Sequence, residues 1–235
     1  MTNPFPVLNS RCFNVFFDFF GVFMNFTGKN LLLYAVGGSD GTEKNKFFTD
    51  LESALKGGIT CFQLREKHLS SDEFLAEAKE VKKLCAKYSV PLIINDNIEI
   101  ALSSGADGVH VGQDDMNIVE VRKIAGEKLV IGVSAHNVEE ALLAEKNGAD
   151  YLGSGAVFGS QTKSNVHTLP LETLRNICSS VKIPVVAIGG INGSNMMQLA
   201  GTGIDGVAVI SAIFGATDIE TECRILKKLA EHAFI

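Results

Sequence analysis

The sequence predicts an α/β fold in which eight parallel strands close into a (β/α)8 TIM barrel, as a single domain. Short apolar runs alternate with helix-length stretches, at 31–36, 59–64, 91–94, 108–111, 129–133, 151–158, 184–188 and 206–210. Strands that are apolar throughout suit a parallel sheet buried on both faces. Eight units in about 200 residues match a barrel better than an open sheet. No Gly-x-Gly-x-x-Gly follows the first run, which weakens the dinucleotide-binding alternative.

A short repeat marks the starts of several strands. Gly105-Ala106-Asp107, Gly148-Ala149-Asp150 and Gly203-Ile204-Asp205 each stand before an apolar run, and Gly57-Gly58-Ile59-Thr60 is a looser copy. Glycine supplies the left-handed cap that ends a helix. The repeat therefore predicts a helix end followed at once by a strand.

The stretches between the runs carry helix-start signals. Ser70 and Glu73 form a capping box ahead of apolar residues at helical spacing, and Asn137 begins a second helix in a similar way. Gly193-Ser194 and Thr217-Asp218 are the predicted starts of the last two helices. Their apolar faces have a structural role against the barrel wall.

Composition limits the classes of function. The chain has 235 residues, 46% hydrophobic and 20% charged, with a formal net charge of -6. A core of one domain is therefore expected, and the acidic balance without a basic patch argues against nucleic-acid binding. The odd number of widely spaced cysteines indicates neither a disulfide framework nor a zinc site and favours a cytoplasmic location; they are Cys12, Cys61, Cys85, Cys178 and Cys223.

Residues 1–29 differ from the rest in their density of phenylalanine. A secretory signal is not expected, since Asn14 and Asp18 interrupt the apolar stretch, and the segment is too interrupted to span a membrane. Two interpretations stay open. The segment is an added helix that covers the barrel bottom or a partner subunit, or the native chain starts at Met24. The phenylalanines are Phe5, Phe13, Phe16, Phe17, Phe19, Phe20, Phe23 and Phe26.

Charged residues with phosphate-binding chemistry follow the second run. Alternation along a strand lets Gln63, Arg65 and Lys67 point together toward the barrel mouth. Arginine offers a planar fork of donors and lysine a compact charge, which suits a polyphosphate. Taken alone, the stretch is also compatible with a solvated charged loop.

Carboxylates follow the next two runs. Asn95-Asp96 ends the third run, and Asp114-Asp115 follows the fourth. Asp96 and Asp115 would together suit Mg²⁺ with water and phosphate oxygens. Each also has a structural interpretation, because Asn-Asp is a common turn pair and Asp115 could cap a helix near Met116. His110 is either a polar residue of the inner rim or a satisfied core histidine.

The remaining runs end in small and polar residues. Ser134 follows the fifth run, and Ser160, Gln161, Thr162 and Lys163 follow the sixth. Gly189-Gly190 and Ile210-Ser211 close the last two, at the usual phosphate position of such barrels. A Gly-Gly pair also serves tight turns.

These motifs, in this order, resemble the thiamine phosphate synthase family. The matching segments are Gln-Leu-Arg-Glu-Lys, Asn-Asp, His-Val-Gly-Gln-x-Asp, Gly-Val-Ser-Ala-His, Thr-Lys and Ala-Ile-Gly-Gly-Ile, within residues 31–230. The resemblance implies a transferase that joins hydroxymethylpyrimidine diphosphate to thiazole phosphate, giving thiamine monophosphate and pyrophosphate. One departure follows the first strand: the family usually shows Tyr-x-Val-Thr-Asp, whereas here Tyr34-Ala35-Val36 runs into Gly37-Gly38-Ser39. Two others are Ser160 in place of threonine and Ala156 in place of proline.

The resemblance also implies roles for individual residues. Arg65, Lys67, Ser134 and Lys163 would be catalytic, and Asp96 and Asp115 would place Mg²⁺ on the pyrophosphate. The thiazole phosphate would contact Ser160, Gln161, Thr162, Gly190, Ile210 and Ser211. The pyrimidine diphosphate would contact Gln63, Leu64, Arg65, Glu66, Lys67, Asn95, Ser134 and Lys163.

Two other functions remain as alternatives. A thiazole tautomerase would not need Arg65, Lys67, Asp96 and Asp115 together, and all are present. A noncatalytic sensor of thiamine intermediates would bind ligand without forming product. The expected partners are small-molecule substrates, without nucleic acid or membrane, and the chain is compatible with a homo-oligomer.

Overall fold

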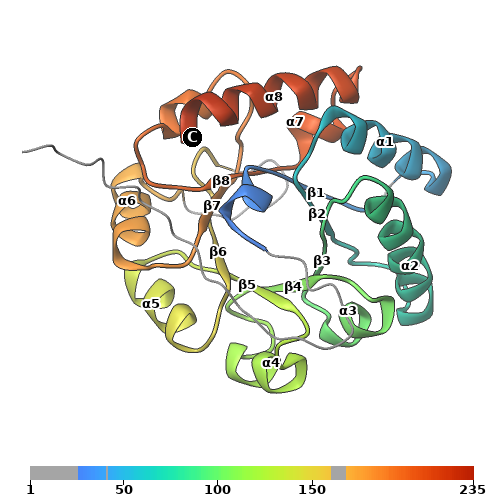
Figure 1. Cartoon of the computed structure of the whole chain (residues 1–235), viewed down its shortest axis with the longest axis horizontal. Helices are drawn as coiled ribbons and strands as arrows, with labels where there is room; N and C mark the ends of the chain where they lie inside the picture. The colour runs from blue at the N-terminus through green and yellow to red at the C-terminus, as the bar shows by residue number, and fades with distance from the viewer. Residues whose placement is uncertain (1–25, 41, 160–167) are drawn as a thin grey trace, which may run out of the picture.

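Eight parallel strands close into a barrel in chain order, and the helices form a ring around it (Figure 1). The computed structural model describes residues 26–40, 42–159 and 168–235. Strands β1 and β8 pair with Tyr34 opposite Ala208, which closes the sheet. The strands are β1 (Leu33–Gly37), β2 (Cys61–Leu64), β3 (Leu92–Asn95), β4 (Gly108–Val111), β5 (Val130–Ser134), β6 (Tyr151–Gly155), β7 (Val185–Ile188) and β8 (Gly206–Val209).

The predicted fold class is therefore confirmed, and each predicted strand lies within two or three residues of an observed one. The outer helices are α1 (Lys44–Gly57), α2 (Ser71–Lys87), α3 (Ile98–Ser104), α4 (Ile118–Ala125), α5 (Val138–Lys146), α6 (Leu171–Ser180) and α8 (Ile219–Phe234). Shorter elements are η1 (Gly28–Leu31), η2 (Met196–Leu199) and α7 (Ser211–Phe214). No helix in the described part of the chain has the length and apolar character needed to cross a membrane.

Local signals account for most helix ends. Ser70 and Glu73 form the predicted capping box of α2, Asn137 caps α5 and Asp218 caps α8. Gly58 and Gly105 adopt the left-handed conformation after α1 and α3, as the repeat predicts. Phe26 packs against Tyr151 from the amino-terminal end of the chain. The proposed helix of the phenylalanine-rich segment lies outside the described residues.

One predicted helix is wrong in extent. The segment after Gly193-Ser194 forms only the four-residue 3₁₀ helix η2. Asn195 accepts a hydrogen bond from the Asn192 amide, and its Nδ2 donates to the Gly190 carbonyl. These side-chain bonds offer the backbone an alternative to helix, which is why the α-helical pattern fails here.

Strand alternation divides the core into two layers. Tyr34, Val36, Cys61 and Ile93 point into the barrel and form a small inner core. Their strand neighbours, such as Leu33, point outward into a larger core beneath the helices. The same alternation continues past β2 and decides which polar side chains enter the barrel mouth.

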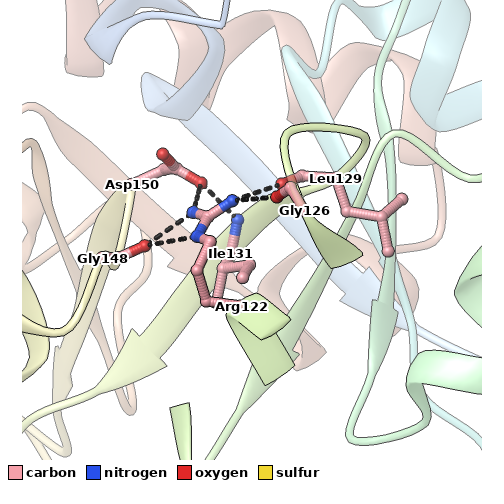
Figure 2. Close-up of polar contacts among 6 residues, drawn as sticks. All are labelled: Arg122, Gly126, Leu129, Ile131, Gly148 and Asp150. Atoms are coloured by element: carbon pink, nitrogen blue, oxygen red, sulfur yellow. Dashed lines mark hydrogen bonds and ion pairs between the residues drawn. The ribbon is translucent and has the colours of Figure 1, made fainter. Parts of the chain in front are cut away.

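At the amino-terminal end of the barrel, each Asp residue of the glycine repeat exchanges two hydrogen bonds with the preceding strand. We call this pair of hydrogen bonds a clasp. The Ile131 amide donates to the Asp150 carboxylate at 2.7 Å, and the Asp150 amide returns a bond to the Ile131 carbonyl at 2.8 Å. Arg122 donates to the same carboxylate and to the Gly148 carbonyl (Figure 2). The same two-way bond joins Leu33 with Thr60, Leu92 with Asp107, and Val185 with Asp205.

Candidate active site

A cavity of about 1200 Å³ opens at the carboxyl ends of the strands. It brings together side chains that lie far apart in the sequence, as expected where parallel strands end on one rim. The described lining includes most of the predicted site residues, which are Gln63, Arg65, Lys67, Asn95, Asp96, Asp115, Ser134, Gly190, Ile210 and Ser211. Their placement at one mouth is confirmed, and their roles toward substrate remain predictions.

Two predicted residues direct their side chains away from the cavity. Leu64 is fully buried in the outer core, and Glu66 accepts a hydrogen bond from the Ser39 amide. Both follow from the alternation that turns Gln63 and Arg65 inward. Ser160, Gln161, Thr162 and Lys163 lie outside the described residues.

Glu66 belongs to a buried acidic pair behind the β2 end. Ser39 Oγ donates to Glu77 at 2.8 Å, and one oxygen each of Glu66 and Glu77 is buried without a hydrogen-bond donor. Burial, followed by the hydrogen bond with Glu77, raises the pKa of Glu66 to about 8. A proton retained on Glu66 and directed at Glu77 accounts for both observations.

The unusual Gly37-Gly38-Ser39 segment is explained by this packing. A Cβ atom on Gly38 would lie 2.3 Å from the Arg65 carbonyl and from Glu66 Oε1. Asp40 then accepts a hydrogen bond from the Lys67 amide at 2.8 Å. Gly38 thus allows the loop after β1 to approach and bind the backbone on both sides of Glu66.

Opposite charges meet where β2, β3 and β4 end. Lys67 forms an ion pair with Asp96, whose backbone is left-handed with φ of 62°. Burial raises the pKa of Asp96, the Asp115 carboxylate raises it further, and Lys67 opposes both. Two neighbouring carboxylates favour a cation between or beside them.

Asp115 closes a turn and does not cap a helix. Its Oδ2 accepts a hydrogen bond from the Gly112 amide at 2.8 Å, and the cap of α4 is Asn117. No group of three or more potential ligand residues is gathered in the described ranges. The pair Asp96 and Asp115 can therefore hold Mg²⁺ only together with water or substrate oxygens, which is a common arrangement for this ion.

The ends of β7 and β8 shape the opposite side of the mouth. Gly189 and Gly190 have φ of 107° and 65°, and a Cβ atom on Gly189 would lie 2.4 Å from that of Ala156. The Gly189 carbonyl accepts a bond from the Phe158 amide at 3.0 Å. The Gly-Gly pair thereby fixes the start of the loop that carries the predicted residues 160–163.

Five polar side chains form a hydrogen-bonded line across the floor of the cavity. Gln63 Nε2 donates to the Tyr34 hydroxyl at 2.8 Å, which lies 2.9 Å from the Tyr151 hydroxyl. The Tyr151 hydroxyl lies 3.0 Å from His110 Nδ1, and His110 Nε2 lies 3.1 Å from Ser134 Oγ. We refer to these five residues as the interior relay.

The relay settles the two interpretations of His110. Its half-buried ring lines the cavity and is hydrogen-bonded at the floor, and desolvation by the surrounding protein lowers its pKa to about 4. The imidazole is thus neutral near pH 7. Sequence reasoning missed Tyr34 and Tyr151, although a tyrosine at an inward position of an otherwise apolar strand is a usable signal.

Residues 33–213 match the family model described as thiamine monophosphate synthase. The thiamine-phosphate synthase of Clostridium acetobutylicum is 47% identical over 194 residues, covering 83% of this chain and 92% of that protein. The chain is also 46% identical to part of the Arabidopsis thaliana thiamine biosynthetic bifunctional enzyme TH1, covering 86% of this chain and 40% of that protein. The structure of thiamine phosphate pyrophosphorylase from Pyrococcus furiosus matches with a TM-score of 0.80 and 39% identity, covering 88% of this chain and 98% of that one.

Proposed function

This chain belongs to the thiamine monophosphate synthase family, and from that membership we propose how its cavity carries out the reaction. The enzyme is a transferase of thiamine biosynthesis that condenses a pyrimidine and a thiazole unit. The substrates we propose are hydroxymethylpyrimidine diphosphate and thiazole phosphate, and the products are thiamine monophosphate and pyrophosphate. The observation that carries this proposal is the meeting of Arg65, Lys67, Asp96 and Asp115 at one mouth.

The pyrimidine diphosphate is assigned to the side formed by β2 to β5. Arg65 and Lys67 supply cationic donors for its phosphates, and Lys163 would add a third charge from the loop after β6. Gln63, Asn95 and Ser134 would hold the remainder of the molecule. Any contact with Leu64 or Glu66 would involve backbone atoms, since their side chains turn away.

The thiazole phosphate is assigned to the opposite side. Gly190, Ile210 and Ser211 line that part of the cavity, and Ser160, Gln161 and Thr162 follow β6 in the sequence. The two substrates would then enter from opposite walls. That arrangement brings the thiazole nitrogen to the pyrimidine methylene carbon above the floor.

The reaction we propose is a dissociative substitution. The carbon–oxygen bond at the pyrimidine methylene breaks, and its electron pair leaves with pyrophosphate. The aminopyrimidine ring stabilises the resulting cation, and the thiazole nitrogen donates the pair that forms the new carbon–nitrogen bond. No protein nucleophile is needed.

The residues of the mouth favour this step electrostatically. Arg65, Lys67 and Lys163 would neutralise the charge that grows on the leaving group, and such positioned charges are often the largest catalytic term. The floor is neutral, because His110 is uncharged near pH 7 and its neighbours are hydroxyl and amide groups. A cation formed above this floor is therefore not repelled by a positive charge beneath it.

Asp96 and Asp115 are the residues we propose to hold Mg²⁺. They fit this role because two adjacent carboxylates share the mouth with the phosphate-binding cations. The bound ion would supply Lewis-acid stabilisation of the pyrophosphate oxygens. Lys67, now paired with Asp96, would turn toward the phosphates when the ion is present.

The partners we propose are the two substrates and further copies of the chain. Val119, Ile124, Leu142 and Leu143 are apolar yet exposed on the neighbouring helices α4 and α5, which supports self-association. A cytoplasmic location is proposed because both substrates are phosphorylated and would be made inside the cell.

The test is incubation of the purified protein with both substrates and Mg²⁺, with and without a chelator. Thiamine monophosphate and pyrophosphate should form in equal amounts, and both should disappear with the chelator. Thiazole rearrangement without coupling would point to the tautomerase. Saturable binding without any product would point to a sensor.

A further inference from the structure

The interior relay has a direction that follows from its first member. Gln63 Nε2 can only donate, so the Tyr34 hydroxyl accepts from it. Either tyrosine could donate in the next bond, and we assign Tyr34 as the donor because its hydrogen then has an acceptor. The Tyr151 hydroxyl, having accepted, donates to His110 Nδ1. A neutral imidazole that accepts at Nδ1 carries its hydrogen on Nε2, so His110 donates to Ser134 Oγ.

The barrel makes room for the relay with two glycines. A Cβ atom on Gly132 of β5 would lie 2.1 Å from Tyr151 Cζ and 2.4 Å from His110 Nδ1. One on Gly153 of β6 would lie 2.9 Å from His110 Cε1. Neither glycine has a positive φ. Their lack of a side chain therefore serves the approach of His110 and Tyr151.

We propose that Tyr34, Tyr151 and His110 are positioning residues that make Ser134 a hydrogen-bond donor toward the pyrimidine diphosphate. Because Ser134 Oγ accepts from His110, its own hydrogen is left to donate upward into the cavity. In the reverse direction, the Ser134 hydroxyl would donate its hydrogen to His110 Nε2. Ser134 would then present only lone pairs to an anionic group, which is repulsive.

The relay begins at the Gln63 side chain, whose Nε2 is directed at the Tyr34 hydroxyl. Two residues on opposite sides of the floor are thus oriented by one set of hydrogen bonds. This inference rests on the proposed pyrimidine site, but the state of His110 is testable without any substrate.

The first test is long-range ¹H–¹⁵N NMR of the full-length protein without ligands. The signals of His110 are assigned by comparison with His110→Gln. We expect a neutral ring protonated at Nε2 at pH 7. A ring protonated at Nδ1, or a charged ring at that pH, would overturn the proposal.

The second test removes single hydroxyl groups and compares the spectra with steady-state kinetics. Tyr151→Phe should give a mixture of tautomers and lower kcat by about 10-fold, the scale of one hydrogen bond. Tyr34→Phe should also give a mixture of tautomers, because the Tyr151 hydroxyl then no longer accepts the bond that directs its hydrogen to His110, and should raise KM for the pyrimidine diphosphate. KM for the thiazole phosphate should stay constant in both.

Tyr88→Phe is the matched control, since it removes a hydroxyl that donates to Glu52 on the outer surface at 3.0 Å. It should change neither the spectrum nor kcat. Unchanged tautomer and kcat in Tyr151→Phe would contradict the proposal. If the unaltered protein shows the Nε2 tautomer but makes no product, the proposed function fails while the direction of the relay stands.

Discussion

Ile131 and Asp150 hold each other by two hydrogen bonds, one in each direction, where β5 and β6 begin. Asp150→Ala would leave the buried Ile131 amide without its acceptor and remove a partner of Arg122. We expect the free energy of unfolding to fall by about 1–3 kcal/mol, the cost of an unsatisfied buried donor. Urea unfolding measures this change.

Asp150→Asn is the control, because it keeps an oxygen acceptor for the amide, and it should lose less stability than the alanine variant. Both should retain normal kcat, because the clasp lies at the barrel end opposite the cavity. An alanine variant as stable as the unaltered chain would contradict this account of the clasp.

Asp96→Ala and Lys163→Ala test the charged mouth. Each should lower kcat by ~10²-fold or more, the scale of losing one group from a preorganised electrostatic site. Urea unfolding separates this effect from lost stability, which we expect for Asp96→Ala because alanine is strained at the left-handed backbone of residue 96. Lys83→Ala, an exposed change on α2, is the control and should keep full activity. Near-normal turnover in both site variants would refute the assignment.

Glu66 should make stability depend on pH. Its pKa rises from 4.5 to about 8 on folding, so the folded chain retains a proton that the unfolded chain releases. The free energy of unfolding should therefore fall as the pH rises from about 4.5 to about 8. Glu66→Gln mimics the protonated acid and should flatten this slope, whereas Glu80→Gln on exposed α2 should not. An equal slope in all three proteins would exclude Glu66 as its source.

Gly132→Ala tests the packing of the relay without removing a polar group. The added methyl would displace Tyr151 or His110, and overpacking of this kind costs about 1–3 kcal/mol. We expect lower stability together with lower kcat. Gly193→Ala, whose Cβ would meet nothing closer than 3.7 Å, should be close to neutral. Thermal unfolding and turnover of both variants provide the comparison.

Local and periodic features could be predicted from the sequence. The run at 108–111 coincides with β4, and Gly105 ends α3 as a left-handed cap. Strand alternation alone predicts that Gln63, Arg65 and Lys67 share one mouth, and all three line the cavity. These successes depend only on neighbours in the chain and on the common rim of parallel strands.

Contacts across the barrel could not be predicted in the same way. Tyr34 and Tyr151 meet only because the closed sheet brings β1 and β6 across one interior, 117 positions apart in sequence. The pairing of Glu66 with Glu77 depends on how α2 returns over the β2 end. The helix expected after Gly193 failed because the asparagines at 192 and 195 bond to nearby backbone.

Because of the clasps, the two ends of the barrel should differ in how well they tolerate substitutions. Thr60, Asp107, Asp150 and Asp205 anchor the sheet from the end that substrates do not reach. Loops on the other end can then vary in length and sequence while the scaffold keeps its register. A library randomised at the cavity rim should yield many folded proteins with altered substrate preference, whereas the same effort at the clasps should yield mostly unfolded ones.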